Sequence, residues 1–172
     1  MFLLYFKIKY WLSRAFLYFF VLKRNGIGAE IGVNKGKNAK LLYYITRPFL
    51  LVLVDCYDGS NRPLEKDKIL CEKISRWADG KRVMLFIEKS KNASEEWGYV
   101  STKLDWIYID ADHYDLYNDL VYWYDNVKSG GVLMGDDYCY TWKEVIDALN
   151  KFCKERNIKY KKLNVQWYFR KP

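Results

Sequence analysis

The stretch Trp106–Tyr114 reads WIYIDADHY, in which an apolar run leads into two aspartates and the only histidine of the chain. A second acidic stretch, Gly135–Tyr138 (GDDY), also follows an apolar run. A short apolar run bounded by turn-forming residues is typical of a buried strand. If the two strands are neighbours, four carboxylates converge at one edge of a sheet. We therefore predict a functional site where these strands end.

From residue 27 onward, short apolar runs alternate with segments of helical periodicity. The expected strands cover 27–33, 49–56, 83–88, 106–110 and 132–135. The expected helices cover 37–46, 63–80, a short segment capped by Ser94, 114–127 with its stop at 128–131, and 141–156. This alternation predicts a parallel sheet with helices on both faces. Two final strand-like runs, 158–163 and 165–170, are too close for anything but an antiparallel hairpin.

Composition limits the class of protein. A chain of 172 residues fits one domain, and 51% hydrophobic residues exclude disorder. The net charge of +8 favours an anionic partner, which could be nucleic acid, membrane lipid or a phosphorylated substrate. The four cysteines form no Cys-x-x-Cys pair, which excludes a zinc knuckle and a redox motif. They are typical of reduced thiols, so we expect a cytoplasmic protein.

The N-terminal segment, residues 1–24, is expected to be an amphipathic helical element ahead of a single domain, residues 25–172. It is apolar and aromatic, but Lys7, Lys9 and Arg14 interrupt it, which disfavours a signal peptide and a membrane span. Its apolar stripe at helical spacing consists of Leu4, Ile8, Trp11, Ala15 and Phe19. Two interpretations stay open: a helix packed on the domain or across a homodimer, and a helix making peripheral contact with a membrane through residues 1–22.

The end of the first strand, EIGVNKG (30–36), has features of a nucleotide-binding loop. Gly32 and Gly36 allow close approach of a ligand to the backbone, and Asn34 tolerates a left-handed conformation. Asp55 follows the second strand, 25 positions after Glu30, where an acid can bind a ribose diol. An ordinary tight turn is the alternative. The segment matches neither Gly-x-Gly-x-x-Gly nor a P-loop, which disfavours NAD and ATP.

Four segments taken in order carry a family resemblance: GAEIGVNKGKNA (28–39), LVLVDCYDG (51–59), WIYIDADHY (106–114) and KSGGVLMGDDY (128–138). Together they resemble the motifs of class I S-adenosylmethionine-dependent methyltransferases. More narrowly, they resemble the metal-dependent sugar O-methyltransferase group that includes macrocin O-methyltransferase. The resemblance implies a Rossmann-like α/β fold, with a mostly parallel seven-stranded sheet, helices on both faces and a C-terminal antiparallel hairpin.

The resemblance also implies roles for single residues. Glu30 and Gly32 would lie by the methionine part of the cofactor, Asp55 by its ribose and Ser90 by its adenine. The full set of implied cofactor-binding residues is Glu30, Gly32, Asn34, Gly36, Asp55, Ser90 and Asp110. Asn34 departs from the family, in which many members have a glycine.

At the acidic site, the resemblance implies that Asp110, Asp136 and Asp137 bind Mg²⁺ or another divalent cation, and that Asp112 is the general base. A cation would relieve the repulsion between crowded carboxylates. His113 is a further catalytic candidate, for contact with substrate. The alternative is that both acid pairs cap the helices that follow them.

These observations predict an O-methyltransferase acting on a hydroxylated small molecule such as a sugar. The Asn/Asp-Pro-Pro-Tyr/Phe motif of many nitrogen methyltransferases is absent after the fourth strand, which favours oxygen as the acceptor. Two alternatives remain. One is an RNA methyltransferase, suggested by the positive charge, with Lys159, Lys161 and Lys162 as a small basic cluster. The other is a membrane-associated protein of this fold without catalysis.

Overall fold

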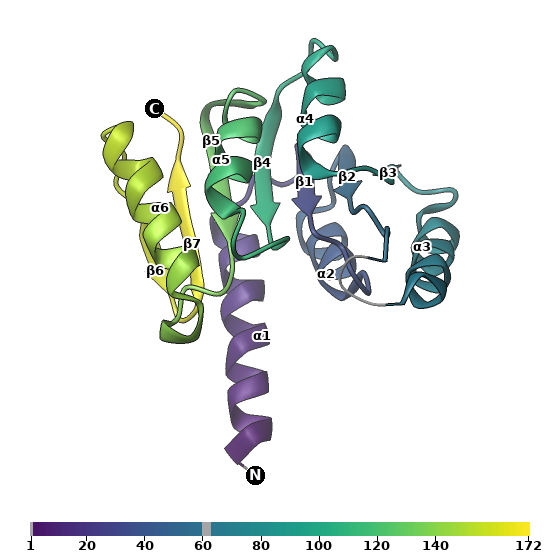
Figure 1. Ribbon diagram of the computed structural model, residues 1–172, viewed down its shortest axis with the longest axis horizontal. Helices are drawn as coiled ribbons and strands as arrows, with labels where there is room; N and C mark the ends of the chain where they lie inside the picture. Colours follow the sequence, from purple (N-terminus) through teal and green to yellow (C-terminus); the bar gives the residue numbers. More distant parts are fainter. Residues whose placement is uncertain (1, 60–62) are drawn as a thin grey trace.

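The computed structural model describes residues 2–59 and 63–172, with side chains from Tyr10 onward. Its sheet has seven strands in the order β3-β2-β1-β4-β5-β7-β6 (Figure 1). The strands are β1 (Ile27–Ile31), β2 (Leu50–Val54), β3 (Val83–Phe86), β4 (Leu104–Ile109), β5 (Val127–Gly135), β6 (Lys161–Leu163) and β7 (Gln166–Arg170). Strands β1 to β5 pair in parallel, whereas β7 is antiparallel to both β5 and β6. The predicted fold class is therefore confirmed.

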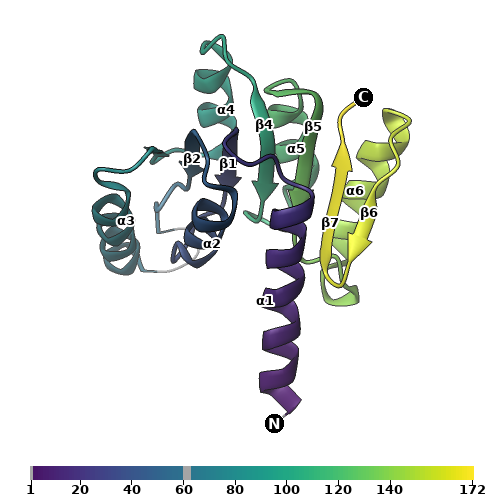
Figure 2. The same ribbon diagram turned by 180° about the vertical axis from the view of Figure 1, so that it is seen from behind.

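Helices cover both faces of the sheet (Figures 1 and 2). One face carries α1 (Phe2–Phe20), α2 (Lys37–Thr46) and α3 (Leu64–Ala78). The other carries α4 (Ser90–Gly98), α5 (Leu116–Tyr124) and α6 (Lys143–Glu155), the last preceded by a short 3-10 turn, η1 (Tyr140–Trp142). Because β1 lies between β2 and β4, the strand order reverses at the β1–β4 pair. Parallel sheets bind ligands beyond the carboxyl ends of the strands at such a switch.

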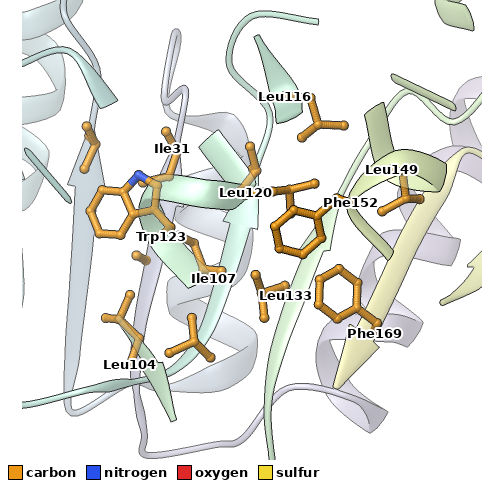
Figure 3. Packing of buried hydrophobic residues seen from close by; sticks show 14 of the residues in the cluster. Ile31, Leu104, Ile107, Leu116, Leu120, Trp123, Leu133, Leu149, Phe152 and Phe169 are labelled. Carbon is orange, nitrogen blue, oxygen red and sulfur yellow. The ribbon is translucent and has the colours of Figure 1, made fainter. Parts of the chain in front are cut away.

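The larger core lies between the sheet and α4, α5 and α6 (Figure 3). Trp123 and Leu120 of α5 are fully buried against Ile107 of β4 and Leu133 of β5, and Phe152 of α6 packs near Phe169 of β7. Aromatic residues of this size contribute several kcal/mol each when buried, about 3–5 kcal/mol on truncation to alanine. This packing fixes β4 and β5 side by side, so that the acidic stretches after them are neighbours.

Two local predictions are wrong. Ser94 does not cap α4, because the helix already begins at Ser90 and the Ser94 hydroxyl donates to the Lys91 carbonyl at 2.6 Å. Residues 128–131 do not stop a helix, because α5 ends at Tyr124 and these residues belong to an irregular start of β5. The register shifts there, since Leu104 pairs with Val127 and Trp106 with Val132.

The face of α1 that packs on the protein is not the apolar stripe identified in the sequence. Trp11 and Phe19 of the expected apolar stripe are exposed, and Leu4 and Ile8 lie outside the described side chains. The buried face instead comprises Ser13, Arg14, Leu17 and Tyr18. The helix turns this mixed face inward because the domain offers polar partners there, which periodicity alone does not reveal.

Candidate active site

A cleft of about 510 Å³ lies at the carboxyl ends of β1, β2 and β4. This volume suits a small-molecule ligand, since such pockets span roughly 300–1,000 Å³. Most of the residues predicted from sequence line the cleft: Gly32, Asn34, Asp55, Ser90, Asp110, Asp112 and His113. Two predicted cofactor residues, Glu30 and Gly36, are not among its lining residues. The topology therefore brings most of the predicted nucleotide-binding and acidic residues to one cavity.

Asp55 fixes the loop after β1. Its Oδ2 accepts a hydrogen bond from the Asn34 backbone N–H at 2.7 Å, and its Oδ1 accepts one from the Tyr57 N–H at 3.1 Å. The Tyr57 hydroxyl in turn donates to the Asn34 carbonyl at 2.8 Å. Asn34 adopts the expected left-handed conformation, with φ of 49°. Each carboxylate oxygen can accept a further hydrogen bond, so Asp55 can still receive ligand hydroxyl groups from the cleft.

Gly32 permits the close approach of two strand ends. Its φ is +87°, and a Cβ at this position would lie 2.2 Å from the Asp110 carbonyl oxygen. The glycine therefore accommodates the protein's own backbone as well as lining the cleft. Gly36 lies at the start of α2 and faces Ile74 of α3, where a Cβ would lie 1.9 Å from the Ile74 Cδ1. Gly36 thus allows helix packing rather than ligand approach.

Glu30 lies behind the cleft, not in it. Its side chain is fully buried and its Oε1 accepts a hydrogen bond from the Asn38 Nδ2 of α2 at 3.0 Å. Burial raises the pKa of Glu30 well above its usual value, which favours the neutral acid. This position differs from the one that the family resemblance implied. Glu30 supports the loop and α2 from below instead of lining the ligand cavity.

Two side chains of the cleft, Asp110 and His113, form a group with the adjoining Asp137 that has the spacing of metal ligands. One ligand atom from each of Asp110, His113 and Asp137 lies within 4.8 Å of the others. The His113 Nε2 is 2.6 Å from the Asp137 Oδ2, and its ring stacks on Trp142 with centroids 4.0 Å apart. Burial and the nearby Asp137 raise the pKa of Asp110 to about 6, although Arg14 opposes the shift. A carboxylate in this position would be stabilised by an additional cation.

Asp136, also predicted as a metal ligand, is not part of this group, although it lines the same small hollow as Asp110, His113 and Asp137. Its carboxylate is buried, and its Oδ2 contacts both the Arg14 guanidinium and the Tyr10 hydroxyl of α1. Its Oδ1 accepts a hydrogen bond from the Gln166 Nε2 at 2.8 Å. Protein donors therefore engage both oxygens, and Asp136 joins α1 to the β7 side of the sheet.

Arg14 is the residue that sequence reasoning missed. Besides Asp136, its guanidinium contacts the Asp110 Oδ2 at 3.3 Å and donates to the Asn38 Oδ1 at 3.0 Å. The side chain is 5% exposed, so the charge is largely removed from water. In the sequence it appears only as a cation interrupting an apolar helix. The two carboxylates that compensate it, on the half-buried Asp110 and the buried Asp136, lie 96 and 122 positions further along (110 − 14; 136 − 14). No local sequence pattern links residues that far apart.

Asp112 is exposed at the mouth of the cleft. Its Oδ1 accepts a hydrogen bond from the Tyr114 backbone N–H at 2.9 Å, and its carbonyl accepts one from the Asp115 N–H at 3.0 Å. It thus orders the turn that leads into α5, but it does not cap the helix, whose N-cap residue is Asp115. Asp112 also lines the cleft.

At the opposite end of the cleft, Ser90 is joined to α5. Its Oγ accepts a hydrogen bond from the Trp123 Nε1 at 3.0 Å. Asp119, also of α5, lines the cleft and is 2% exposed. Burial raises the pKa of Asp119 to about 7, while a hydrogen bond from Ser90 opposes the shift. The helical register of α5 therefore turns Asp119 inward, toward the cleft.

Solved structures with the same fold are mostly methyltransferases. An O-methyltransferase from Bacillus cereus, in complex with S-adenosylhomocysteine, aligns with a TM-score of 0.72 and 15% identity over 93% of this chain and 81% of that one. The S-adenosylhomocysteine-bound methyltransferase of Podospora anserina gives 0.64 and 19%, over 86% and 72%. An rRNA methylase from Streptococcus thermophilus gives 0.62 and 14%, over 93% and 94%. At these identities the likeness concerns the fold alone.

Sequence comparison identifies the family. No curated protein matches the chain significantly. A family model described as a methyltransferase domain matches residues 29–138, which extend from β1 through the acidic pair after β5. The match covers more than half of the chain and includes the loop after β1, Asp55 and the acidic group at the cleft floor. The chain belongs to this methyltransferase family and is an S-adenosylmethionine-dependent methyltransferase.

Proposed function

We propose that the enzyme methylates a hydroxyl group of a sugar or a similar small molecule, with the help of a divalent cation, as the macrocin-type group does. The observation that carries this proposal is the group formed by Asp110, His113 and Asp137, of which Asp110 and His113 line the cleft and Asp137 lies beside it. It lies beside the β1 loop, where a methyl donor held by Gly32 and Asn34 would place its reactive end.

The cleft suggests how the donor is oriented. Asp55 is suited to the ribose hydroxyls, because each of its oxygens holds one backbone N–H and can accept one more donor. Ser90 and Asp119 line the far end, where the resemblance implies the adenine. With these ends fixed, the methyl group would point toward Asp110. Such positioning alone accounts for a large part of the rate of a bimolecular reaction.

The acidic group fits a cation by its donor set. Two carboxylates and one imidazole, all half-buried, have ligand atoms within 4.8 Å of one another. Carboxylate oxygens suit Mg²⁺ and Mn²⁺, and the imidazole shifts the preference toward Mn²⁺ or another transition metal. A bound divalent cation would lower the pKa of an acceptor hydroxyl and orient it. We therefore place the metal site on Asp110, His113 and Asp137, and no longer on Asp136.

The chain's own residues handle the proton. In methyl transfer the acceptor oxygen forms a bond to the methyl carbon as the carbon–sulfur bond breaks, and the hydroxyl proton must pass to a base. Asp112, at the mouth of the cleft, is the base that the resemblance implies. His113 is the second candidate, because the contact between its Nε2 and Asp137 would orient the imidazole when no cation is bound.

Calorimetry with S-adenosylhomocysteine and with Mn²⁺ tests the proposal. We expect the wild type to bind both. Asp137→Asn should weaken Mn²⁺ binding at least tenfold and leave the affinity for S-adenosylhomocysteine within about twofold, because Asp137 does not line the donor cleft. Asp55→Asn should do the reverse. Failure of the wild type to bind S-adenosylhomocysteine would refute the donor site, and equal Mn²⁺ affinity of Asp137→Asn would refute the metal site.

An RNA acceptor is the second candidate. It rests on the net charge of +8 and on the exposed Lys159, Lys161 and Lys162 around β6. RNA binding of this kind weakens steeply as salt rises, because counterions are released from the phosphates. Binding of a labelled RNA hairpin that falls by a factor of ten or more between about 50 and 200 mM salt would favour RNA over a small hydroxylated acceptor.

The site of action is expected to be the cytoplasm. All four cysteines, Cys56, Cys71, Cys139 and Cys153, are free thiols in the structure. Structural disulfides are common in oxidising compartments and rare in the cytosol. A label specific for free thiols that reacts with the protein taken directly from cells would support this expectation.

A further inference from the structure

The side of α1 that faces away from the domain is apolar and aromatic. Leu17 and Tyr18 are buried against the sheet and α2, whereas five large apolar side chains point outward with exposed fractions of 36% to 66%. These residues, which we call the α1 outer face, are Trp11, Leu12, Phe16, Phe19 and Phe20. The Phe20 ring lies 4.6 Å from that of Phe16 and 5.0 Å from that of Phe19, so the face is a continuous patch.

Positive charge surrounds this patch. The first 29 residues contain no aspartate or glutamate but five cations, Lys7, Lys9, Arg14, Lys23 and Arg24. Lys23 and Arg24 are exposed at the end of the helix, and the Arg24 guanidinium lies 5.6 Å from the Phe19 ring centroid. Lys23 and Arg24 therefore bring positive charge to the end of the helix, beside the patch.

A basic hollow of about 570 Å³ adjoins the outer face at Phe20. Lys23, Lys128 and Arg170 are among its lining residues. Asp105 also lines it, but its carboxylate already pairs with Lys23 at 2.8 Å and with Lys128 at 2.9 Å. Three cations against one carboxylate leave the hollow positive, which suits a phosphate or carboxylate headgroup.

We propose that the α1 outer face lies in the headgroup layer of an anionic membrane and attaches the protein there as a peripheral anchor. Aromatic side chains and cations on one helix face are the usual combination for such binding. A second copy of the chain is a poorer partner, because each chain carries a net charge of +8. Its first 29 residues contain no carboxylate that could pair with the cations of the other copy. Anionic lipid supplies the missing negative charge.

The direction of α1 agrees with attachment at a surface. The helix runs out from the sheet past the edge to which the arrowheads of β1 and β4 point (Figures 1 and 2). That is the edge with the cleft, so attachment through α1 would hold the active site near the bilayer surface. Within the part of the chain that the structure describes, no helix is long and apolar enough to cross a membrane.

Vesicle flotation of the full chain tests the proposal. Vesicles of phosphatidylcholine with about 30% phosphatidylserine should carry the wild type upward, and pure phosphatidylcholine should carry much less. The variant Phe16→Ser/Phe19→Ser/Phe20→Ser should partition at least tenfold more weakly. The matched control Tyr44→Ser/Tyr99→Ser/Tyr140→Ser removes three exposed aromatics outside α1 and should float like the wild type.

Two further measurements separate the outcomes. Lys23→Gln/Arg24→Gln should lose much of its preference for anionic vesicles, because it removes the exposed cations at the end of the helix. Thermal melting without lipid should show that every variant is folded. The proposal is overturned if the wild type ignores anionic vesicles or if the triple phenylalanine variant floats equally well. It is also overturned if light scattering shows a dimer that the triple phenylalanine variant dissolves, because the patch would then bind a second copy.

Discussion

Removal of Arg14 offers the sharpest test of how α1 is attached to the site. Arg14 and Asp136 are each 4% exposed and are in direct contact, and Arg14 also lies 3.3 Å from Asp110. Arg14→Met would leave the buried Asp136 and the half-buried Asp110 without their cation. Breaking a buried ion pair by removing one partner costs about 3–5 kcal/mol of unfolding free energy. We therefore expect a loss in that range for Arg14→Met.

A double-mutant cycle measures the energetic coupling between Arg14 and Asp136. Asp136→Asn should cost less than Arg14→Met, because Arg14 keeps Asp110 as a partner. The double variant Arg14→Met/Asp136→Asn removes both charges, so its loss should be well below the sum of the single losses. Urea denaturation followed by circular dichroism measures all four proteins. Losses that add to within about 0.5 kcal/mol would refute the ion pair as the energetic link between α1 and the sheet.

Three further predictions concern the site. Arg14→Met should bind Mn²⁺ more tightly than the wild type in calorimetry, because Asp110 and Asp136 lose their internal cation; equal or weaker binding would contradict this competition. Asp119→Asn should flatten the pH dependence of unfolding. The pKa of Asp119 is raised from 3.8 to about 7 in the folded protein, so the unfolded chain binds fewer protons between these pH values. Wild-type stability therefore falls as pH rises from about 4 to 7. The loss is about 4 kcal/mol at most ((7 − 3.8) × 1.36). Gly32→Ala should lose S-adenosylhomocysteine binding and several kcal/mol of stability in denaturation experiments. The control is Gly80→Ala, where φ is +66° and no atom lies within 4 Å of the added Cβ. It should cost only about 1 kcal/mol.

The orientation of the His113 imidazole depends on its contact with Trp142. The stacked pair of His113 and Trp142 lies at the floor of the cleft and joins the loop after β4 to η1. Trp142 therefore positions an imidazole that is both a candidate ligand and a candidate base. Replacement of Trp142 would remove the ring on which His113 stacks and would leave the imidazole itself in place. Such a variant tests the orientation of His113 separately from its presence.

The sequence by itself determined the order of elements and the placement of the cleft. Apolar runs and helical periods are local signals, so the helix 37–46 was predicted with its observed bounds and the final hairpin with its direction. Parallel strands bring their carboxyl ends to one edge, which is why Asp55, Asp110 and His113 could be expected together. These inferences need only neighbouring residues and the geometry of a parallel sheet.

Only the tertiary structure decided which charges meet. Arg14 reaches Asp110 and Asp136, Glu30 turns away from the cleft toward Asn38, and Asp119 turns into it. Each outcome depends on the packing of an element from a distant part of the chain, and burial sets the cost of leaving any of these charges unpaired. Periodicity reports that a residue lies on one face of a helix. It does not report what the rest of the protein presents to that face, which is why α1 buries Arg14 and leaves Phe16, Phe19 and Phe20 exposed.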